Sequence, residues 1–314
     1  MVAVVFLSLN WIALDFAEAE ESSENAMKEK GLVTEQEYNA LKEHRRMLRP
    51  QVFSSEKQPF QAQQSESSSG KKQQKEVWEI GTELSYIKYE EPDVMDETGT
   101  MFGIVGSYIY RDNGMFKAEG KWSYGQVDYD GQLQDGTPYT ISGIDDYMLE
   151  IRGLAGYDFS VLKTITVTPY VGFGYRYLND DTSIDAAGYE RESNYFYSPI
   201  GIEAINNLKD GWSLGAKVEF DIFWAGIQKS HISDIAAGLN DIKNDQEDGY
   251  GVRGSIKIQK EGDKIDFLIE SFLKYWNIGE SKTSDITYNG SYIGYGYEPK
   301  NNSIEIGGKL AVKF

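Results

Sequence analysis

The fold is decided by the last thirteen residues, Asn302-Ser303-Ile304-Glu305-Ile306-Gly307-Gly308-Lys309-Leu310-Ala311-Val312-Lys313-Phe314. One face of this run holds Ile304, Ile306, Gly308, Leu310, Val312 and Phe314. The other face holds Glu305, Gly307, Lys309, Ala311 and Lys313. A period of two, with one apolar and one charged face, is typical of a β-strand between two different environments. A strand of a water-soluble barrel or sandwich is the alternative.

This run resembles the last strand of bacterial outer-membrane β-barrels, which typically ends in Phe. The barrel-assembly machinery reads that residue in such proteins, so the resemblance implies that Phe314 is an assembly signal. Nine earlier segments have a related pattern and are predicted as strands: 77–89, 100–110, 115–126, 146–159, 164–177, 194–205, 211–225, 249–259 and 264–277.

The predicted connections between these strands alternate in length. Short ones fall near 111–114, 160–163, 206–210 and 260–263, and longer ones near 90–99, 127–145, 178–193, 226–248 and 278–301. Short periplasmic turns that alternate with long outer loops are typical of outer-membrane barrels. We therefore expect an all-β protein, with residues 76–314 forming a ten-stranded antiparallel up-and-down transmembrane β-barrel. Eight or twelve strands are alternatives.

The segment before the barrel is expected to have three parts. Residues 1–19 are predicted to be a signal peptide with a cleavage site at Ala17-Glu18-Ala19, although a basic start is missing and a buried helix is the alternative. Residues 20–49 are predicted to be a periplasmic helical segment. Within it, Lys28 to Lys42 resembles a short helical-hairpin motif of bacterial proteins, which implies self-association or an envelope partner for residues 22–48. Residues 50–75, rich in Gln, Ser and Lys, are predicted to be a disordered polar linker.

Tryptophan spacing supports a membrane location. Trp212 and Trp224 share one face of a predicted strand and lie about 30 Å apart along the membrane normal, given a rise of ~3.3 Å per residue and a tilt of ~40°. We expect aromatic girdles formed by Trp78, Trp212, Trp224 and Trp276, with outer-membrane lipid and lipopolysaccharide as partners. The aromatic core of a soluble sandwich is the alternative.

The opposite faces of the strands carry both signs of charge. We expect a mutually paired network in the lumen, because an unpaired charge in a narrow lumen is costly. Its predicted members are Glu150, Arg152, Lys217, Glu219, Arg253, Glu270, Lys274 and Glu305. A selectivity filter would show one sign in excess, which these faces do not.

Composition limits the possible partners. The net charge of −19 argues against nucleic acid, and the absence of cysteine excludes disulfides and thiolate metal sites. No cofactor or metal is expected. The one exception is a possible calcium ion in the acidic outer loops, suggested by Asp128-Tyr129-Asp130-Gly131.

Acidic residues at the strand mouths, and the stretches Ser198-Pro199-Ile200-Gly201, Asp210-Gly211-Trp212 and Phe223-Trp224, resemble the omptin family of outer-membrane endopeptidases. In that family an Asp pair and an Asp–His pair activate a water, with His as general base. The resemblance implies that Asp128 and Asp130 face His231 and Asp234. The sequence departs from the family here, because His231-Ile232-Ser233-Asp234 places His before Asp.

Three functions are therefore considered. The first is a non-enzymatic structural, adhesive or partner-binding barrel that recognises ligands through acidic outer loops. The second is an omptin-like endopeptidase, and the third is a passive channel for small solutes.

Overall fold

The computed structural model describes residues 75–132, 136–185 and 188–314. The predicted signal peptide (1–19), helical segment (20–49) and all but the last residue of the predicted linker (50–75) lie outside these residues. Across the described part of the chain, no helix is both long and apolar enough to cross a membrane.

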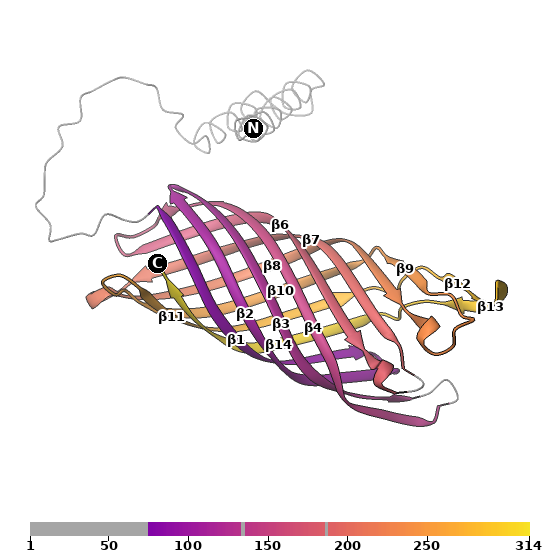
Figure 1. The fold of residues 1–314 in the computed structure, drawn as a ribbon. Coiled ribbons are helices and arrows are strands. Elements are labelled where there is room, and N and C mark those ends of the chain that lie inside the picture. Colours follow the sequence, from indigo (N-terminus) through magenta and orange to yellow (C-terminus); the bar gives the residue numbers. More distant parts are fainter. Residues whose placement is uncertain (1–74, 133–135, 186–187) are drawn as a thin grey trace, which may run out of the picture. The chain divides into compact units, whose positions relative to one another are not determined.

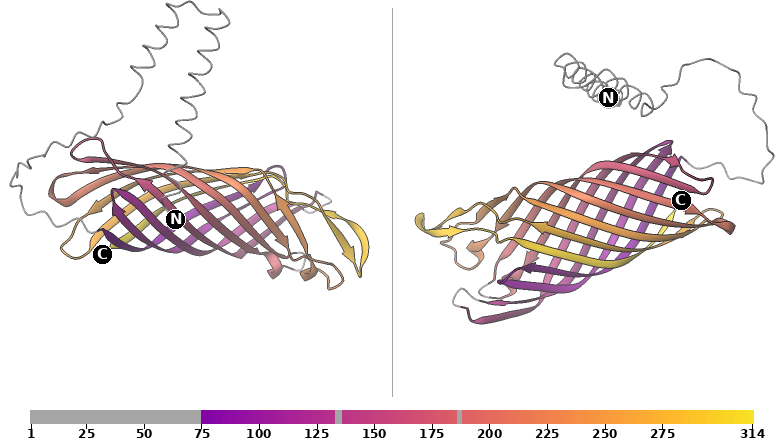
Figure 2. Two further views of the ribbon diagram at one scale, coloured as in Figure 1. Left: turned by 90° about the horizontal axis from the view of Figure 1, so that it is seen from above. Right: turned by 180° about the vertical axis from the view of Figure 1, so that it is seen from behind.

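Ten long strands in the described residues close into an antiparallel barrel, as predicted (Figures 1 and 2). Each pairs with the next, and β8 pairs directly with β10. The strands are β1 (Glu76–Glu91), β2 (Met95–Asp112), β3 (Gly114–Gln132), β4 (Pro138–Tyr157), β6 (Ile165–Asp181), β7 (Glu190–Asn207), β8 (Trp212–Ser230), β10 (Gly249–Lys260), β11 (Asp266–Ile278) and β14 (Asn301–Lys313).

The C-terminal strand closes the barrel against the first strand. β14 pairs with β1 from Glu79↔Lys313 to Glu90↔Asn302. Beyond this ladder, the Phe314 N–H donates to the Trp78 carbonyl at 3.0 Å and the Trp78 N–H donates to the Phe314 carbonyl at 2.9 Å. The last residue of the sequence therefore extends the seam at which the barrel closes.

Smaller elements lie between the long strands. They are β5 (Phe159–Ser160), β9 (Ile242–Gln246), β12 (Ser284–Tyr288), β13 (Ser291–Gly296) and the 3-10 turns η1 (Thr182–Ile184), η2 (Lys209–Gly211) and η3 (Ile232–Asp234). β9 extends the wall by pairing with β8, and β12 and β13 form a hairpin. Figure 1 shows β9, β12 and β13 at the end of the barrel away from the C-terminus.

Several strands are longer than predicted. β1 to β8, β5 apart, have 16 to 20 residues, against the ~9–11 residues that cross a bilayer. Most of the predicted loop 90–99 is strand, and β3 continues to Gln132. The barrel therefore continues well beyond the apolar belt at the end with the longer connections, and side chains predicted to lie in loops are held in a rigid wall.

The two faces of the wall differ in chemistry. Outward side chains such as Leu84, Ile151 and Val218 are apolar and exposed, while inward side chains such as Glu219, Asp221 and Arg253 are charged and buried. A wall with exposed apolar and buried charged side chains is suited to lipid outside and a polar lumen inside.

Three of the four tryptophans predicted for the aromatic girdles face outward, and the fourth faces the lumen. Trp78, Trp212 and Trp224 are exposed on the outer wall, whereas Trp276 is only 2% exposed and packs inside the barrel. In β11 the outward positions are odd-numbered (Phe267, Ile269), so Trp276 has the opposite parity and must face the lumen. Trp276 therefore cannot belong to a lipid-facing girdle.

Candidate functional site

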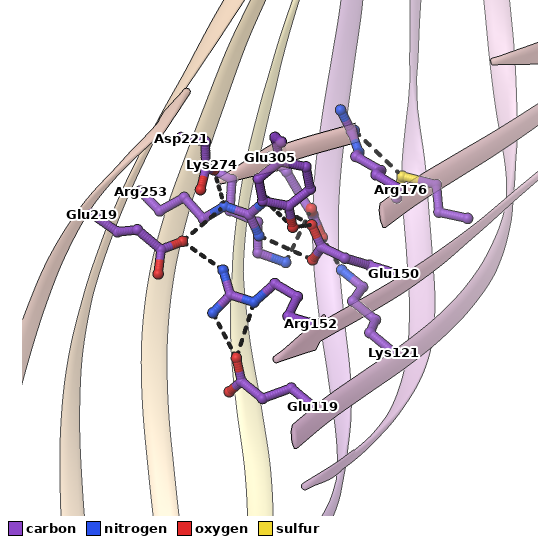
Figure 3. Close-up of polar contacts among 12 residues, drawn as sticks. Glu119, Lys121, Glu150, Arg152, Arg176, Glu219, Asp221, Arg253, Lys274 and Glu305 are labelled. Atoms are coloured by element: carbon purple, nitrogen blue, oxygen red, sulfur yellow. Dashed lines mark hydrogen bonds and ion pairs between the residues drawn. The ribbon is translucent and has the colours of Figure 1, made fainter. Parts of the chain in front are cut away.

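The centre of the lumen is crossed by two arginines that join non-adjacent strands. Arg152 of β4 donates to Glu119 of β3 at 2.6 and 2.9 Å, and to Glu219 of β8 at 2.5 Å. The second carboxylate oxygen of Glu219 accepts from the Tyr170 hydroxyl at 2.7 Å. Figure 3 shows the guanidinium of Arg152 between Glu119 and Glu219. Because β6 and β7 lie between β4 and β8 in the sheet, this contact runs through the lumen and not along the wall.

Arg253 of β10 makes the second crossing. It binds both oxygens of Glu150 on β4, at 2.6 and 2.9 Å, and donates to Asp221 of β8 at 2.5 Å. Its guanidinium also stacks on Tyr197 and Trp276, with distances of 5.2 and 5.4 Å to the ring centroids. A bidentate, stacked arginine has a fixed geometry, so this part of the lumen is rigid.

The remaining predicted lumen residues also point inward. Glu305 binds Lys121 at 2.5 Å and Lys274 at 3.3 Å, and Glu270 binds Lys309 at 2.6 Å. Lys217 lines a small cavity beside these pairs. That cavity has a volume of about 80 Å³, which accommodates a few water molecules. The predicted network therefore fills the lumen with paired charges.

Nearer the outer end, a second cluster has an excess of negative charge. Arg191 of β7 lies 2.9 Å from Glu91, 3.0 Å from Asp180, 3.5 Å from Glu97 and 3.9 Å from Glu298. These four carboxylates come from β1, β6, β2 and the connection between β13 and β14. The guanidinium of Arg191 therefore joins β7 to three other strands and to the last outer connection. Burial, with repulsion from Glu91, raises the pKa of Glu298 to about 7 against the opposing effect of Arg191.

Sequence reasoning missed this mouth cluster because its members fell in predicted loops. The signal was present: Met95, Glu97 and Met101 follow the inward parity of β2, and all three are buried. The alternation of buried and more exposed residues thus continues past the predicted start of this strand.

His231 lies just after β8, between two carboxylates. Its Nε2 is 3.1 Å from Glu192 and its Nδ1 is 3.2 Å from Asp241. The Ser233 hydroxyl donates to the other oxygen of Asp241 at 2.7 Å. Burial, which acts to lower the pKa of His231, is outweighed by the hydrogen bonds to Glu192 and Asp241, so that its pKa is raised.

The residues predicted for peptide hydrolysis do not meet. Asp128 and Asp130 lie on β3 with the outward parity of Trp122, and both are exposed. Asp128 accepts a hydrogen bond from the Gly143 N–H at 3.0 Å. Asp234 accepts one from the Glu190 N–H at 3.2 Å. Within the described residues, no hydrogen bond or ion pair joins any of these carboxylates to the imidazole of His231. Asp128 and Asp130 were expected in a loop but are held outward by the extended strand β3.

Metal binding receives no geometric support from the described residues, since no group of three or more His, Asp or Glu side chains among them is arranged to hold an ion. Calcium binding by the acidic outer loops stays a prediction.

The β12–β13 hairpin presents an exposed aromatic surface. Tyr288, Tyr292, Ile293, Tyr295 and Tyr297 are 47 to 63% exposed. The hairpin is anchored by a bridge between Leu239 and Tyr288, and by Asn240, whose side-chain oxygen accepts from the Thr287 N–H at 2.6 Å. We call Tyr292, Ile293 and Tyr295 the hairpin surface.

Comparisons with known proteins agree with the barrel fold. The family model for autotransporter β-domains matches residues 93–255. No curated protein matches the sequence significantly. The outer membrane protease OmpT from Escherichia coli is similar in structure, with a TM-score of 0.53, 10% identity, and coverage of 76% of this chain and 96% of OmpT. The Ralstonia pickettii toluene transporter TbuX has a TM-score of 0.34, 10% identity, and coverage of 76% of this chain and 88% of TbuX.

Proposed function

The chain belongs to the autotransporter β-domain family, and on this basis we propose that it acts in the bacterial outer membrane as a closed barrel that binds a partner through its outer end. The observation that carries this proposal is the hairpin surface. Three large apolar side chains, Tyr292, Ile293 and Tyr295, are each about 60% exposed on an anchored hairpin beyond the apolar belt. Exposed aromatic patches of this kind are typical of interaction sites.

The charge around the hairpin surface indicates the chemistry of the partner. Exposed acidic residues lie on the hairpin, on β9 and on the neighbouring connections: Asp241, Asp245, Glu247, Asp248, Glu280 and Asp285. Lys282 is neutralised by an ion pair with Glu247. A partner segment that combines basic and apolar side chains would complement both features of this end.

The filled lumen favours binding over transport. Arg152 and Arg253 each make contacts across the lumen, and the cavity beside them has room for only a few waters. A solute would have to displace several paired, buried charges, each with a high cost of separation. The passive-channel hypothesis is therefore less favoured.

The endopeptidase hypothesis also has less support. Its mechanism needs carboxylates that share a water with His231, but Asp128 and Asp130 are directed outward from β3. The likeness to OmpT, at 10% identity, supports the fold and not its chemistry.

The proposal is tested with the full chain, folded in detergent and immobilised, against an array of short peptides that differ in net charge and apolar content. We expect at least about tenfold stronger retention of basic apolar peptides than of acidic ones. A variant carrying Tyr292→Ser, Ile293→Ser and Tyr295→Ser should lose that preference.

The matched control is Val161→Ser with Leu162→Ser, which removes two exposed apolar side chains from the short turn at the opposite end. This control should bind as the unmodified chain does. Equal retention of basic and acidic peptides, or retention that survives the triple substitution, would disprove the proposal.

A further inference from the structure

We propose that the exposed edge of β13 binds the partner by strand addition. The partner is then an extended peptide segment in which apolar and basic side chains alternate, and its backbone pairs with β13. This inference rests on the proposed function, because it concerns the same hairpin. It adds a requirement on the conformation of the partner, so the two proposals can be tested apart.

The two edges of the β12–β13 hairpin are not equivalent. Along the edge formed by β12, the Asn240 N–H donates to the Thr287 carbonyl at 3.3 Å. Among the strands of the described residues, β13 pairs with β12 alone. At the last residue of β13, the Gly296 carbonyl accepts a hydrogen bond from the Asn244 side chain at 3.1 Å. The rest of this outer edge therefore offers backbone N–H and C=O groups to a further strand.

The exposed edge has a fixed shape before any partner binds. β12 and β13 are joined by the two-residue turn Asn289-Gly290, in which the two φ angles are positive, at 49° and 79°. Positive φ at both positions is typical of the type I′ turn, which matches the twist of paired strands. Neither strand contains lysine or proline, which protect many natural edge strands against pairing. A partner therefore joins an ordered template, which lowers the entropy cost of binding.

A β-bulge places two tyrosines on one face of this template. Tyr292 pairs with Thr287, and Tyr295 pairs with Asp285. The two β12 residues are two positions apart and share a face, whereas their partners are three apart, because β13 has one extra residue there. Tyr292 and Tyr295 therefore lie on the same face. Apolar side chains on one face of an added strand would pack on these two rings.

The remaining side chains of an added strand point to its other face, because successive side chains of a strand alternate. The outer end of the barrel carries an excess of exposed acidic residues, among them Asp245 and Glu247. Basic side chains between the apolar ones would complement this charge. An alternating apolar and basic segment therefore satisfies both the tyrosine face and the acidic surroundings.

A second copy of this chain fits the edge less well than a peptide does. Pairing two β13 edges would bring together the acidic residues of both outer ends, including Asp285, and like charges repel. The bulge also increases the twist of β13, and bulged edges disfavour pairing between rigid sheets. A single flexible peptide can follow the twist and can carry the opposite charge.

The test uses the full chain, folded in detergent and immobilised, with pairs of peptides of about eight residues. The two peptides of a pair have the same apolar and basic residues. These alternate in one peptide and follow helical spacing (i, i+3, i+4, i+7) in the other. We expect the alternating peptide to be retained at least about tenfold better.

N-methyl groups on the peptide backbone then separate strand pairing from side-chain contact. A strand pairs at one edge through the N–H groups of alternate residues, because the other N–H groups point to its opposite edge. Methylation of one alternate set of amides in the best-retained peptide should abolish retention. Methylation of the other set should preserve most of it, and this peptide is the matched control because it carries a similar load of methyl groups.

Three results would overturn the inference. The first is equal retention of the alternating and helically spaced peptides, and the second is the same effect from both sets of methyl groups. In either case basic apolar peptides are still retained, so the proposed function stands. The third is a dimer of the full chain that the variant carrying Tyr292→Ser, Ile293→Ser and Tyr295→Ser does not form, which would assign the edge to a second copy.

Absence of retention for every basic apolar peptide has a different meaning. It would refute the proposed function, and strand addition with it. Heat-modifiable migration of the unmodified chain and of the variant on semi-native gels confirms that the barrel is folded.

Discussion

Protonation of the His231 imidazole strengthens its contacts with Glu192 and Asp241, which hold the connection after β8 in place. Its raised pKa means that its contacts to Glu192 and Asp241 are fully present below about 6.5 and are lost as pH rises through the raised pKa. Hydrogen bonds from Ser233 lower the pKa of Asp241, so its contribution is present above about 3.9 and is lost as pH falls through the lowered pKa. The contact is therefore strongest between about pH 4 and 6.5.

We predict that amide hydrogen exchange of residues 231–241 is slowest in this window and accelerates severalfold toward about pH 8. His231→Gln should remove most of the pH dependence. The exchange rates should be corrected for the intrinsic effect of pH. A corrected rate that does not change between about pH 5 and 8 would contradict the coupling.

Arg253 holds several lumen side chains in place through its contacts with Glu150 and Asp221. Arg253→Met leaves Glu150 and Asp221 buried without their main partner, which costs about 3–5 kcal/mol for a buried pair. We predict a clear fall in the urea midpoint of the barrel in detergent. Lys282→Met removes an exposed ion pair with Glu247 and should cost about 0–1 kcal/mol. Equal midpoints for the two variants would show that the lumen pair adds no stability.

Trp276 shows how far single residues could be predicted. Its even-numbered position in β11 already indicates an inward side chain, whereas the preference of tryptophan for membrane interfaces indicates an outward one, and the position decides. The inward direction of Glu150, Arg152 and Glu219 followed from the same rule and is correct. The contacts of Arg152 with Glu219 and of Arg253 with Glu150 were not predictable, because each joins two strands that do not pair with one another.

β6 and β7 pack closely at two places where a tyrosine ring of one strand lies over a glycine of the other. Gly174 is paired with Tyr197, and Gly201 with Tyr170. A Cβ atom added at either glycine would lie 2.2 or 2.4 Å from the ring opposite. We predict that Gly174→Ala and Gly201→Ala each destabilise the barrel by about 1–3 kcal/mol, measured as the urea midpoint.

Gly120→Ala is the control for these substitutions, because an added Cβ there meets no atom within 4 Å. It should leave the midpoint within about 0.5 kcal/mol of the unmodified chain. If Gly120→Ala proved as harmful as Gly174→Ala, the loss would come from strand propensity and not from the ring contact.

The mouth cluster makes the last outer connection sensitive to pH. The raised pKa of Glu298 means that this carboxyl is neutral in acid and becomes charged, at a cost, as pH rises through about 7. Stability from this group is therefore present at low pH and lost at high pH. We predict that the amide hydrogens of Tyr297, Glu298 and Lys300 exchange faster at about pH 8 than at pH 6, after correction for intrinsic rates.

Glu298→Gln, which keeps the shape of the side chain without its charge, should abolish this difference. Glu247→Gln, at an exposed site, should preserve it. Faster exchange in acid than in base would reverse the predicted sign and exclude Glu298 as the cause.

For the molecule as a whole, strand number and closure were predictable because alternation and turn length are local signals. The seam between β1 and β14 followed once Phe314 was recognised as the end of a strand. The outer end was less predictable: the β12–β13 hairpin is stabilised by contacts such as Asn240 with Thr287, 47 residues apart. Long-range contacts of this kind leave no periodic trace in the sequence.

The paired charges that fill the lumen predict that the barrel does not conduct ions. The unmodified chain in planar lipid bilayers should give no stepwise conductance, since Arg152 and Arg253 close the lumen by their contacts to Glu119, Glu150, Glu219 and Asp221. Replacing Glu150, Arg152, Glu219, Asp221 and Arg253 together by Ala removes both signs of charge and leaves a wider, hydrated lumen. That variant should conduct, provided that heat-modifiable migration shows it folded. Steps from the unmodified chain would refute closure, and a flat trace from the folded variant would mean that other side chains close the barrel.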